Sequence, residues 1–235
     1  MNKSVLVIGD THSPYHHPDA LAFLKAIKKK YKPDRTIHIG DELDFHFWSY
    51  HEADPDLMWA WDELKEWRKF LHKLEKIFPT MDLLESNHGS MAWRKAKTAG
   101  LSKEVLKSYR DVIFPEWLWE WWNWHPSLDV TLSNWENCHF CHQAEANIVN
   151  HAWHYWTSMV AWHRHSKADI WYCSSPYSLR FWMHVWCLID WKSLAFAYNK
   201  LQKKRPILSV GLIINGVPML QPMFLDKDWN WIWKL

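Results

Sequence analysis

The chain has 235 residues, with 28 basic against 26 acidic side chains and a formal charge of +2. This balance predicts no strong field for a nucleic acid or a membrane, and the length suits one domain over residues 1–235. The N-terminal apolar run of four residues is too short for a signal peptide, and no stretch approaches the roughly 18 apolar residues of a membrane span. We therefore expect a soluble, cytoplasmic protein without a membrane partner; its oligomeric state stays open.

The first part of the chain alternates predicted strands and helices. Short apolar runs rich in β-branched residues predict buried strands at residues 4–8, 35–39 and 81–85. Helical spacing of apolar residues predicts amphipathic helices at residues 19–30 and 57–78. Each predicted strand runs into a polar loop, and this repeated order predicts an α/β fold.

The second part of the chain is predicted to consist mainly of strands. Alternating or apolar segments predict strands at residues 128–132, 137–141, 157–161, 207–214 and 217–223. We place one hairpin turn at Asn134-Trp135 and another at Asn215-Gly216. Residues 45–55 and 117–126 are interpreted as connecting segments that shape substrate choice.

Five polar motifs follow one another along the chain: Gly9-Asp10-Thr11-His12, Gly40-Asp41-Glu42-Leu43-Asp44, Ser86-Asn87-His88-Gly89, His142 and His163-Arg164-His165. Oxygen and imidazole donors suit Mn, Fe, Zn or Ni. Loops at the C-terminal ends of parallel strands converge above a sheet. At the edge of a strand, Asp10 and His12 would also point the same way. These donors predict a metal site.

In their order and spacing, these motifs resemble those of the calcineurin-like metallophosphoesterases: D-x-H, G-D-x-x-D, G-N-H-(D/E), a later H, and G-H-x-H. The resemblance implies a four-layer αββα sandwich. It also implies hydrolysis of a phosphomonoester or phosphodiester through a hydroxide that bridges two divalent ions, with Mn expected first and Fe, Zn or Ni as alternatives. By analogy, we expect a nucleotide or nucleic-acid substrate and a prokaryotic or phage source.

The resemblance also assigns roles to residues. One ion would be held by Asp10, His12 and His165, and the other by Asn87, His142 and His163, with Asp41 bridging the two. His88 would stabilise the phosphoryl oxygens or protonate the leaving group, and Asp44 would support a ligand from behind. Arg94 follows the Asn87-His88 loop closely, and we expect it to face a substrate phosphate.

Four residues depart from the family pattern. Ser86 replaces the Gly before Asn87, and Gly89 replaces the acid that usually orients the preceding histidine. Gln143 stands where the family often has Gly. Trp162 replaces the Gly before His163, where an indole would crowd a tight loop.

The composition offers one explanation for Trp162. The chain has 21 Trp and 6 Gly, whereas average usage gives about 16 Gly in this length. Several Trp residues stand where turn chemistry favours Gly, including Trp135, Trp162 and Trp229. We hypothesise that relatives carry Gly at such positions, because a UGA codon reassigned to Gly was read as Trp. The alternative is a genuinely Trp-rich protein.

Two other functions remain open. Cys138-His139-Phe140-Cys141-His142 matches the C-x-x-C-H pattern of haem attachment, and the same two cysteines with Cys173 and Cys187 offer four thiolates for zinc. In a reducing compartment we expect all four instead to stay reduced and to pack as small apolar residues.

The other alternative is a nucleic-acid-binding module with a decayed catalytic centre. Its phosphate contacts would come from basic residues in three parts of the chain: Lys28-Lys29-Lys30, then Arg94, Lys95 and Lys97, and Lys203-Lys204-Arg205.

Overall fold

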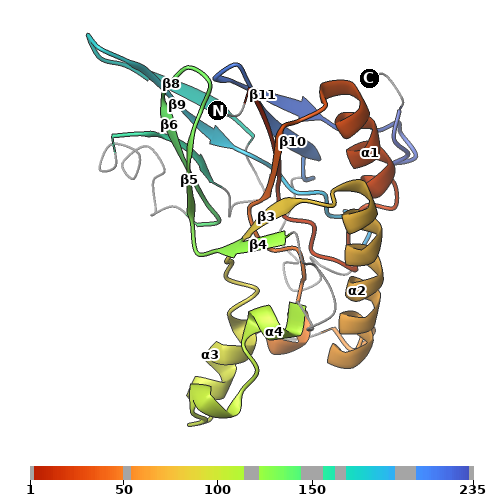
Figure 1. The fold of residues 1–235 in the computed structure, drawn as a ribbon. Helices are drawn as coiled ribbons and strands as arrows, with labels where there is room; N and C mark the ends of the chain where they lie inside the picture. The colour runs from red at the N-terminus through yellow and green to blue at the C-terminus, as the bar shows by residue number, and fades with distance from the viewer. Residues whose placement is uncertain are drawn as a thin grey trace.

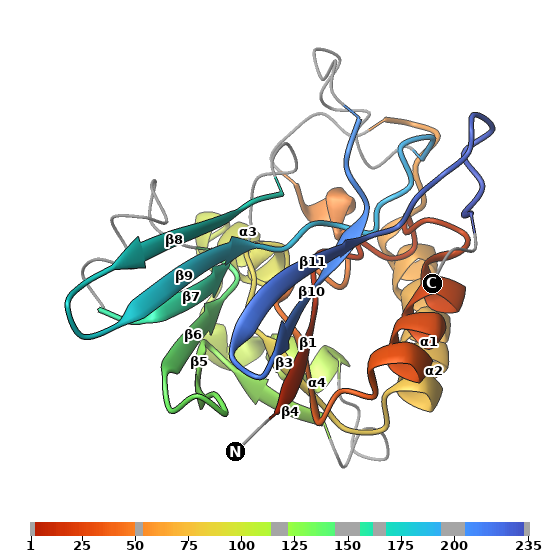
Figure 2. The ribbon, with the colours of Figure 1, turned by 90° about the horizontal axis from the view of Figure 1, so that it is seen from above.

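The computed structural model describes residues 3–49, 54–113, 122–143, 156–161, 168–193 and 205–232. Eleven strands in this part of the chain form two sheets that pack face to face (Figures 1 and 2). None of its helices is long and apolar enough to cross a membrane.

The first sheet has six strands in the order β11-β10-β1-β2-β3-β4. Its members are β1 (Ser4–Ile8), β2 (Arg35–His38), β3 (Met81–Leu84), β4 (Trp122–His125), β10 (Ser209–Ile214) and β11 (Val217–Pro222). Strands β1 to β4 are parallel, and β10 joins β1 antiparallel. β4 corrects the interpretation of residues 117–126 as only a connection. Its sequence lacks a continuous apolar run, and backbone pairing with β3 defines the strand.

The second sheet has five strands in the order β5-β6-β7-β9-β8. They are β5 (Leu128–Thr131), β6 (Asn137–Cys141), β7 (Ser158–Ala161), β8 (Ile170–Ser174) and β9 (Leu179–His184). Of these, β8 and β9 were not predicted. The hairpin turn between β5 and β6 lies at Asn134 and Trp135 as predicted, and Trp135 has φ 68°.

Two long helices confirm the helical predictions: α1 (Ala20–Tyr31) and α2 (Ala60–Ile77). Side chains alternate between the faces of β1. Leu6 and Ile8 join a core cluster with residues of α1 and α2, whereas Val5 and Val7 join Phe140 in a core between the sheets. The α/β class and the packed sheets confirm the predicted fold, and the described residues contain three of its four layers.

A helical arm, residues 91–113, projects away from the sheets (Figure 1). It contains α3 (Met91–Thr98), a short 3₁₀ helix (Lys103–Val105) and α4 (Tyr109–Ile113). Another 3₁₀ turn (His46–Trp48) follows β2. The arm was not predicted, because residues 91–113 form several short helical pieces rather than one long periodic segment.

Three Trp residues have a left-handed backbone: Trp135 with φ 68°, Trp156 with φ 49° and Trp229 with φ 72°. Bulky L-residues rarely adopt this conformation, whereas Gly adopts it readily. Two of the three were singled out from the sequence. The backbone geometry favours Gly at these positions. That a reassigned codon explains why the sequence has Trp there stays a hypothesis.

Candidate metal centre

The candidate ligands lie where strands of both sheets end. Asp10 follows β1, Asp41 follows β2, Asn87 and His88 follow β3, and His142 follows β6. The segment before His12 is not the strand edge that was predicted. His12 has φ 42°, and the backbone N–H groups of Thr11 and His12 donate to the Asp41 carbonyl at 3.1 and 2.9 Å. This crossing of two loops brings the first two motifs together.

Three histidine side chains converge on one carboxylate oxygen. The Nε2 atoms of His142, His12 and His88 lie 3.1, 3.6 and 3.9 Å from Oδ2 of Asp41. His142 Nε2 also lies 2.6 Å from Oδ1 of Asn87. Asp41 is only 2% exposed. Its carboxylate therefore lies next to His12 of one group of predicted ligands and to His142 of the other.

Asp10 completes the inner part of the cluster. Its Oδ2 lies 4.0 Å from His12 Nε2, and its Oδ1 lies 3.7 Å from His142 Nδ1. Asp10, Asp41 and His142 each offer one donor atom, and these atoms lie within 4.8 Å of one another. His12, Asp44 and His88 form a second such group. Two adjacent groups of donors thus share one buried region.

Hydrogen bonds fix the orientation of all three imidazoles. Nδ1 of His142 donates to the Ile39 carbonyl at 3.0 Å, and Nδ1 of His12 lies 2.6 Å from Oδ1 of Asp44. Nδ1 of His88 donates to the Asp44 carbonyl. Each bond leaves Nε2 directed towards Asp41, and such outer contacts fix the tautomer that binds a metal.

The Asp44 carbonyl explains how His88 is held without the usual acid at residue 89. The His88 backbone N–H also donates to Oδ1 of Asp41 at 3.1 Å. At the other departure, Ser86 Oγ accepts the Gly89 N–H at 3.2 Å. Both substitutions therefore fit the loop.

Charge in the cluster favours a cation. Burial raises the pKa of Asp10 to about 7. Burial also acts to raise the pKa of Asp41, but His142, His88 and His12 together outweigh it and hold that pKa well below its usual range. Burial lowers the pKa of His12 and His142, but neighbouring carboxylates overcome it and raise both to about 9. Positive charge would therefore stabilise the buried carboxylates of Asp10 and Asp41. Carboxylate, imidazole and amide donors of this kind suit divalent metal ions.

A pocket of about 390 Å³ opens beside His142 and Asn87. Arg94 lies at its edge, where Nη2 donates to the Asn87 carbonyl at 3.0 Å. Glu85 also lines it. The structure thus brings Arg94 to the cluster formed by Asp10, His12, Asp41, Asn87, His88 and His142. The predicted ligands His163 and His165, together with Trp162, lie outside the described residues.

Sequence reasoning missed a second buried network behind Asp44. His46 Nδ1 lies 3.5 Å from Asp44 Oδ2 and 3.2 Å from Glu63 Oε2. Glu63 is fully buried. A signal was present, because Glu63 lies four and seven residues before Trp67 and Phe70, on the apolar face of α2.

The cysteines do not support haem attachment. Cys138 and Cys141 lie three residues apart on β6 and join different core clusters. Their side chains therefore face opposite sides of the sheet. None of the four cysteines forms a disulfide, and Cys138, Cys141 and Cys187 are buried as predicted.

A family model described as calcineurin-like phosphoesterase matches residues 3–175. Similar solved structures include Vps29 from Chaetomium thermophilum, with 11% identity, a TM-score of 0.49, and coverage of 99% of this chain and 93% of that chain. Vps29 from Entamoeba histolytica in complex with Zn²⁺ has 9% identity, a TM-score of 0.46, and coverage of 93% and 97%. Vacuolar Protein Sorting 29 from Cryptosporidium parvum has 11% identity, a TM-score of 0.45, and coverage of 94% and 96%. No curated protein matches the chain.

Proposed function

Because the chain belongs to the calcineurin-like phosphoesterase family, we propose that it is a metal-dependent hydrolase of phosphate esters. The observation that carries this proposal is the convergence of three Nε2 atoms on Oδ2 of Asp41. The substrate would be a phosphomonoester or a phosphodiester, with a nucleotide or nucleic acid favoured.

The donor set suggests how two ions would be held. Asp10 and His12 would bind one ion together with His165, and Asn87 and His142 would bind the other together with His163. Asp41 would contact both. Mn is the first expectation, with Fe, Zn and Ni as alternatives. When bound, such ions would supply positive charge to the phosphoryl oxygens and a water of lowered pKa as nucleophile.

His88 would act on the substrate rather than on the metals. Its Nδ1 donates to the Asp44 carbonyl, so Nε2 donates a proton only when the ring is an imidazolium. Burial lowers the pKa of His88, whereas Asp41 and the Asp44 carbonyl oppose that change. A phosphate dianion beside Nε2 would further favour the imidazolium, which would then stabilise the phosphoryl oxygens or protonate the leaving group.

Arg94 would hold a non-reacting oxygen of the substrate. Its guanidinium is exposed at the pocket edge and is kept beside Asn87 by the bond to the Asn87 carbonyl. A guanidinium offers further N–H donors in a planar fork, which suits phosphate. Arg94→Ala should therefore raise KM more than it lowers kcat.

The direct test is hydrolysis of p-nitrophenyl phosphate and bis-p-nitrophenyl phosphate by protein stripped of metal and then given Mn²⁺. We expect no turnover after stripping and recovery on addition of Mn²⁺, Fe²⁺, Zn²⁺ or Ni²⁺. Binding of single-stranded DNA without turnover under any of these conditions would contradict the hydrolase and favour the binding module with a decayed centre.

A further inference from the structure

The helical arm carries a basic surface next to the candidate metal centre. We propose that residues 91–113 bind the sugar-phosphate backbone of a nucleic-acid strand, one phosphate of which enters the pocket at Asn87 and His142. This inference rests on the proposed phosphoesterase function and names its substrate class as a polynucleotide rather than a mononucleotide.

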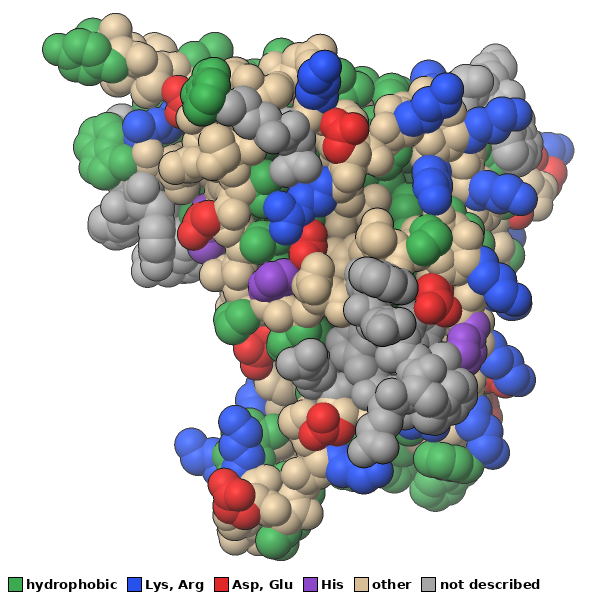
Figure 3. Space-filling view, viewed as in Figure 1, with side chains coloured by type: hydrophobic (Ala, Val, Ile, Leu, Met, Phe, Trp, Pro, Cys, Tyr) green, Lys and Arg blue, Asp and Glu red, His purple; other side chains and the backbone are tan. Residues whose placement is uncertain are grey.

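Charge distinguishes the arm from the rest of the chain. Residues 91–107 contain five basic side chains and one acid, Glu104, although the whole chain is almost balanced. Lys97, Lys103 and Lys107 are exposed, and none of them forms an ion pair with any described residue. Basic side chains lie over the arm in the lower left of Figure 3. Such unpaired cations suit a polyanion.

Both ends of the arm are bonded to loops that carry candidate ligands. At its start, Arg94 donates to the Asn87 carbonyl. At its end, the Tyr109 hydroxyl donates to Glu42, the residue after Asp41. Because Arg94 belongs to the arm and also lines the pocket, a strand bound along the arm would reach the pocket at this residue.

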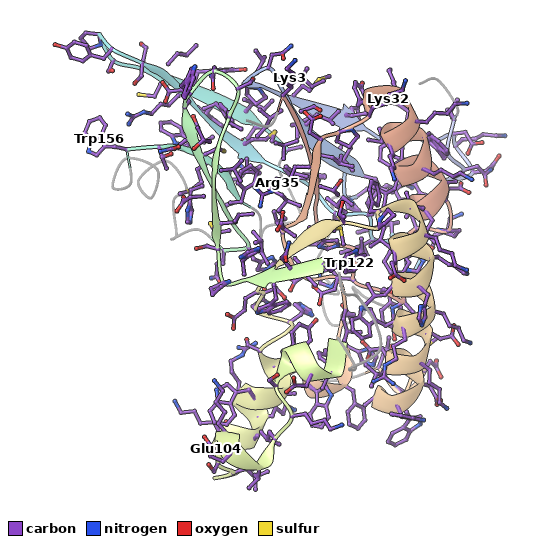
Figure 4. All side chains as sticks on the ribbon, viewed as in Figure 1. Lys3, Lys32, Arg35, Glu104, Trp122 and Trp156 are labelled. Carbon is purple, nitrogen blue, oxygen red and sulfur yellow. The ribbon has the colours of Figure 1, made fainter. Side chains whose placement is uncertain are left out.

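The positive charge at the far end of the arm favours a polymeric substrate over a small one. Glu104 marks this end in Figure 4, well away from the sheets, and Lys103 is its neighbour in the chain. A mononucleotide bound at Asn87 and His142 would leave Lys103 and Lys107 without a phosphate. A polynucleotide carries a phosphate at every unit and would reach them.

Apolar side chains between the lysines favour a nucleic acid over an acidic peptide. Leu101, Val105 and Leu106 are exposed, and Val105 keeps 69% of its surface accessible. They would contact the bases and sugars of a strand whose phosphates face the lysines. A purely acidic peptide such as polyglutamate offers the charge but no apolar surface for these side chains to contact.

The test measures anisotropy of a fluorescein-labelled oligothymidylate in EDTA, so that binding does not depend on turnover. The arm variant is Lys97→Gln/Lys103→Gln/Lys107→Gln. The matched control, Lys25→Gln/Lys73→Gln/Lys76→Gln, removes the same charge from exposed positions of α1 and α2, outside the arm. Urea unfolding of both variants verifies that each is folded.

We expect the arm variant to bind about tenfold more weakly and to lower the slope of log K against log salt by about 2, since each strand phosphate contributes roughly 0.7. The affinity of the control variant for the oligothymidylate should stay within twofold of that of wild type. Equal losses in both variants, or equal affinity for polyglutamate and the oligonucleotide, would overturn the proposal. Arm-dependent binding with no hydrolysis of bis-p-nitrophenyl phosphate by wild type would uphold the surface and refute the hydrolase.

Discussion

Gly89 packs against the ring of Tyr109 so closely that a Cβ on Gly89 would meet Cε1 of Tyr109 at 2.7 Å. Gly89 directly follows His88, and Tyr109 also donates to Glu42. The arm is therefore packed onto the loop that positions His88. The missing acid at residue 89 leaves the space that Tyr109 occupies.

Gly89→Ala should lower the free energy of unfolding by about 1–3 kcal/mol, because an added methyl overpacks the contact with Tyr109. Urea denaturation measures the loss. In a Tyr109→Ala background the same substitution should cost little, since the ring is gone. Equal costs in the two backgrounds would show that the contact with Tyr109 is not the reason.

Trp135→Gly should stabilise the protein by about 1 kcal/mol, because Gly relieves a left-handed backbone that an L-residue adopts at a cost. Trp135 has φ 68°, and 76% of its side chain is exposed, so little packing is lost. The control is Trp171→Gly, at a side chain 55% exposed in β8. Gly in a strand should destabilise by about 1 kcal/mol.

Thermal or urea unfolding shows whether Trp135→Gly is stabilised while Trp171→Gly is destabilised. Destabilisation of similar size in both variants would show that the backbone at residue 135 is not strained. The decoding hypothesis has its own measurement, which is the mass of the peptide that contains residue 135 from the native source. Gly at that position would support it, and Trp would refute it.

Protonation of His16 in the unfolded chain should lower the free energy of unfolding in mild acid. Burial lowers the pKa of His16 to about 4, with further lowering from Lys73 and His17. The unfolded chain, with an ordinary histidine pKa near 6.5, therefore binds more protons between pH 6.5 and 4. Stability should fall as the pH falls through that window, by about 1–2 kcal/mol between pH 7 and 5.

His16→Leu should remove this part of the pH dependence, since no proton can bind. Urea unfolding of metal-free protein at pH 7 and 5 gives the comparison. Wild type should lose more stability than the variant over this range. Parallel losses in the two proteins would show that His16 is not the responsible group.

His88→Ala should keep bound metal and lose turnover, by roughly 10²-fold to 10⁴-fold if the ring transfers a proton. The reason is that His88 lies further from Asp41 Oδ2 than His142 and His12 do. Elemental analysis and p-nitrophenyl ester hydrolysis on one sample separate the two effects. The control His125→Ala removes a histidine that pairs with Asp82 instead. Loss of metal in His88→Ala would show instead that His88 is a metal ligand.

The strands beside the centre were predictable because their apolar runs end directly in polar motifs. Asp10, Asp41 and Asn87 meet because parallel strands end at one edge of the sheet. β4 and β8 were missed for a different reason. β4 mixes indoles with Asn123, and β8 is an edge strand with exposed Trp171 and Tyr172. Their limits depend on pairing with β3 and β9 rather than on their own pattern.

The supporting contacts of the site could not be predicted. The acceptor for His88 is a backbone carbonyl at Asp44, and a carbonyl is present at every residue, so no motif marks it. Tyr109 reaches Glu42 from a separate helix, and only the folded chain shows that pairing. Sequence order thus predicted that the described donors Asp10, Asp41 and His142 would meet, and tertiary packing determined how each is oriented.

In the proposed function, Asp41 links two metal sites. Metal content by elemental analysis, measured with bis-p-nitrophenyl phosphate turnover in the same samples, tests it in wild type, Asp41→Asn and Glu42→Gln. Glu42 is the matched control, since it is equally buried but bonds to Tyr109. We predict that Asp41→Asn loses metal and turnover together while Glu42→Gln keeps bound metal. Full metal content and turnover in Asp41→Asn would contradict the bridging role of Asp41.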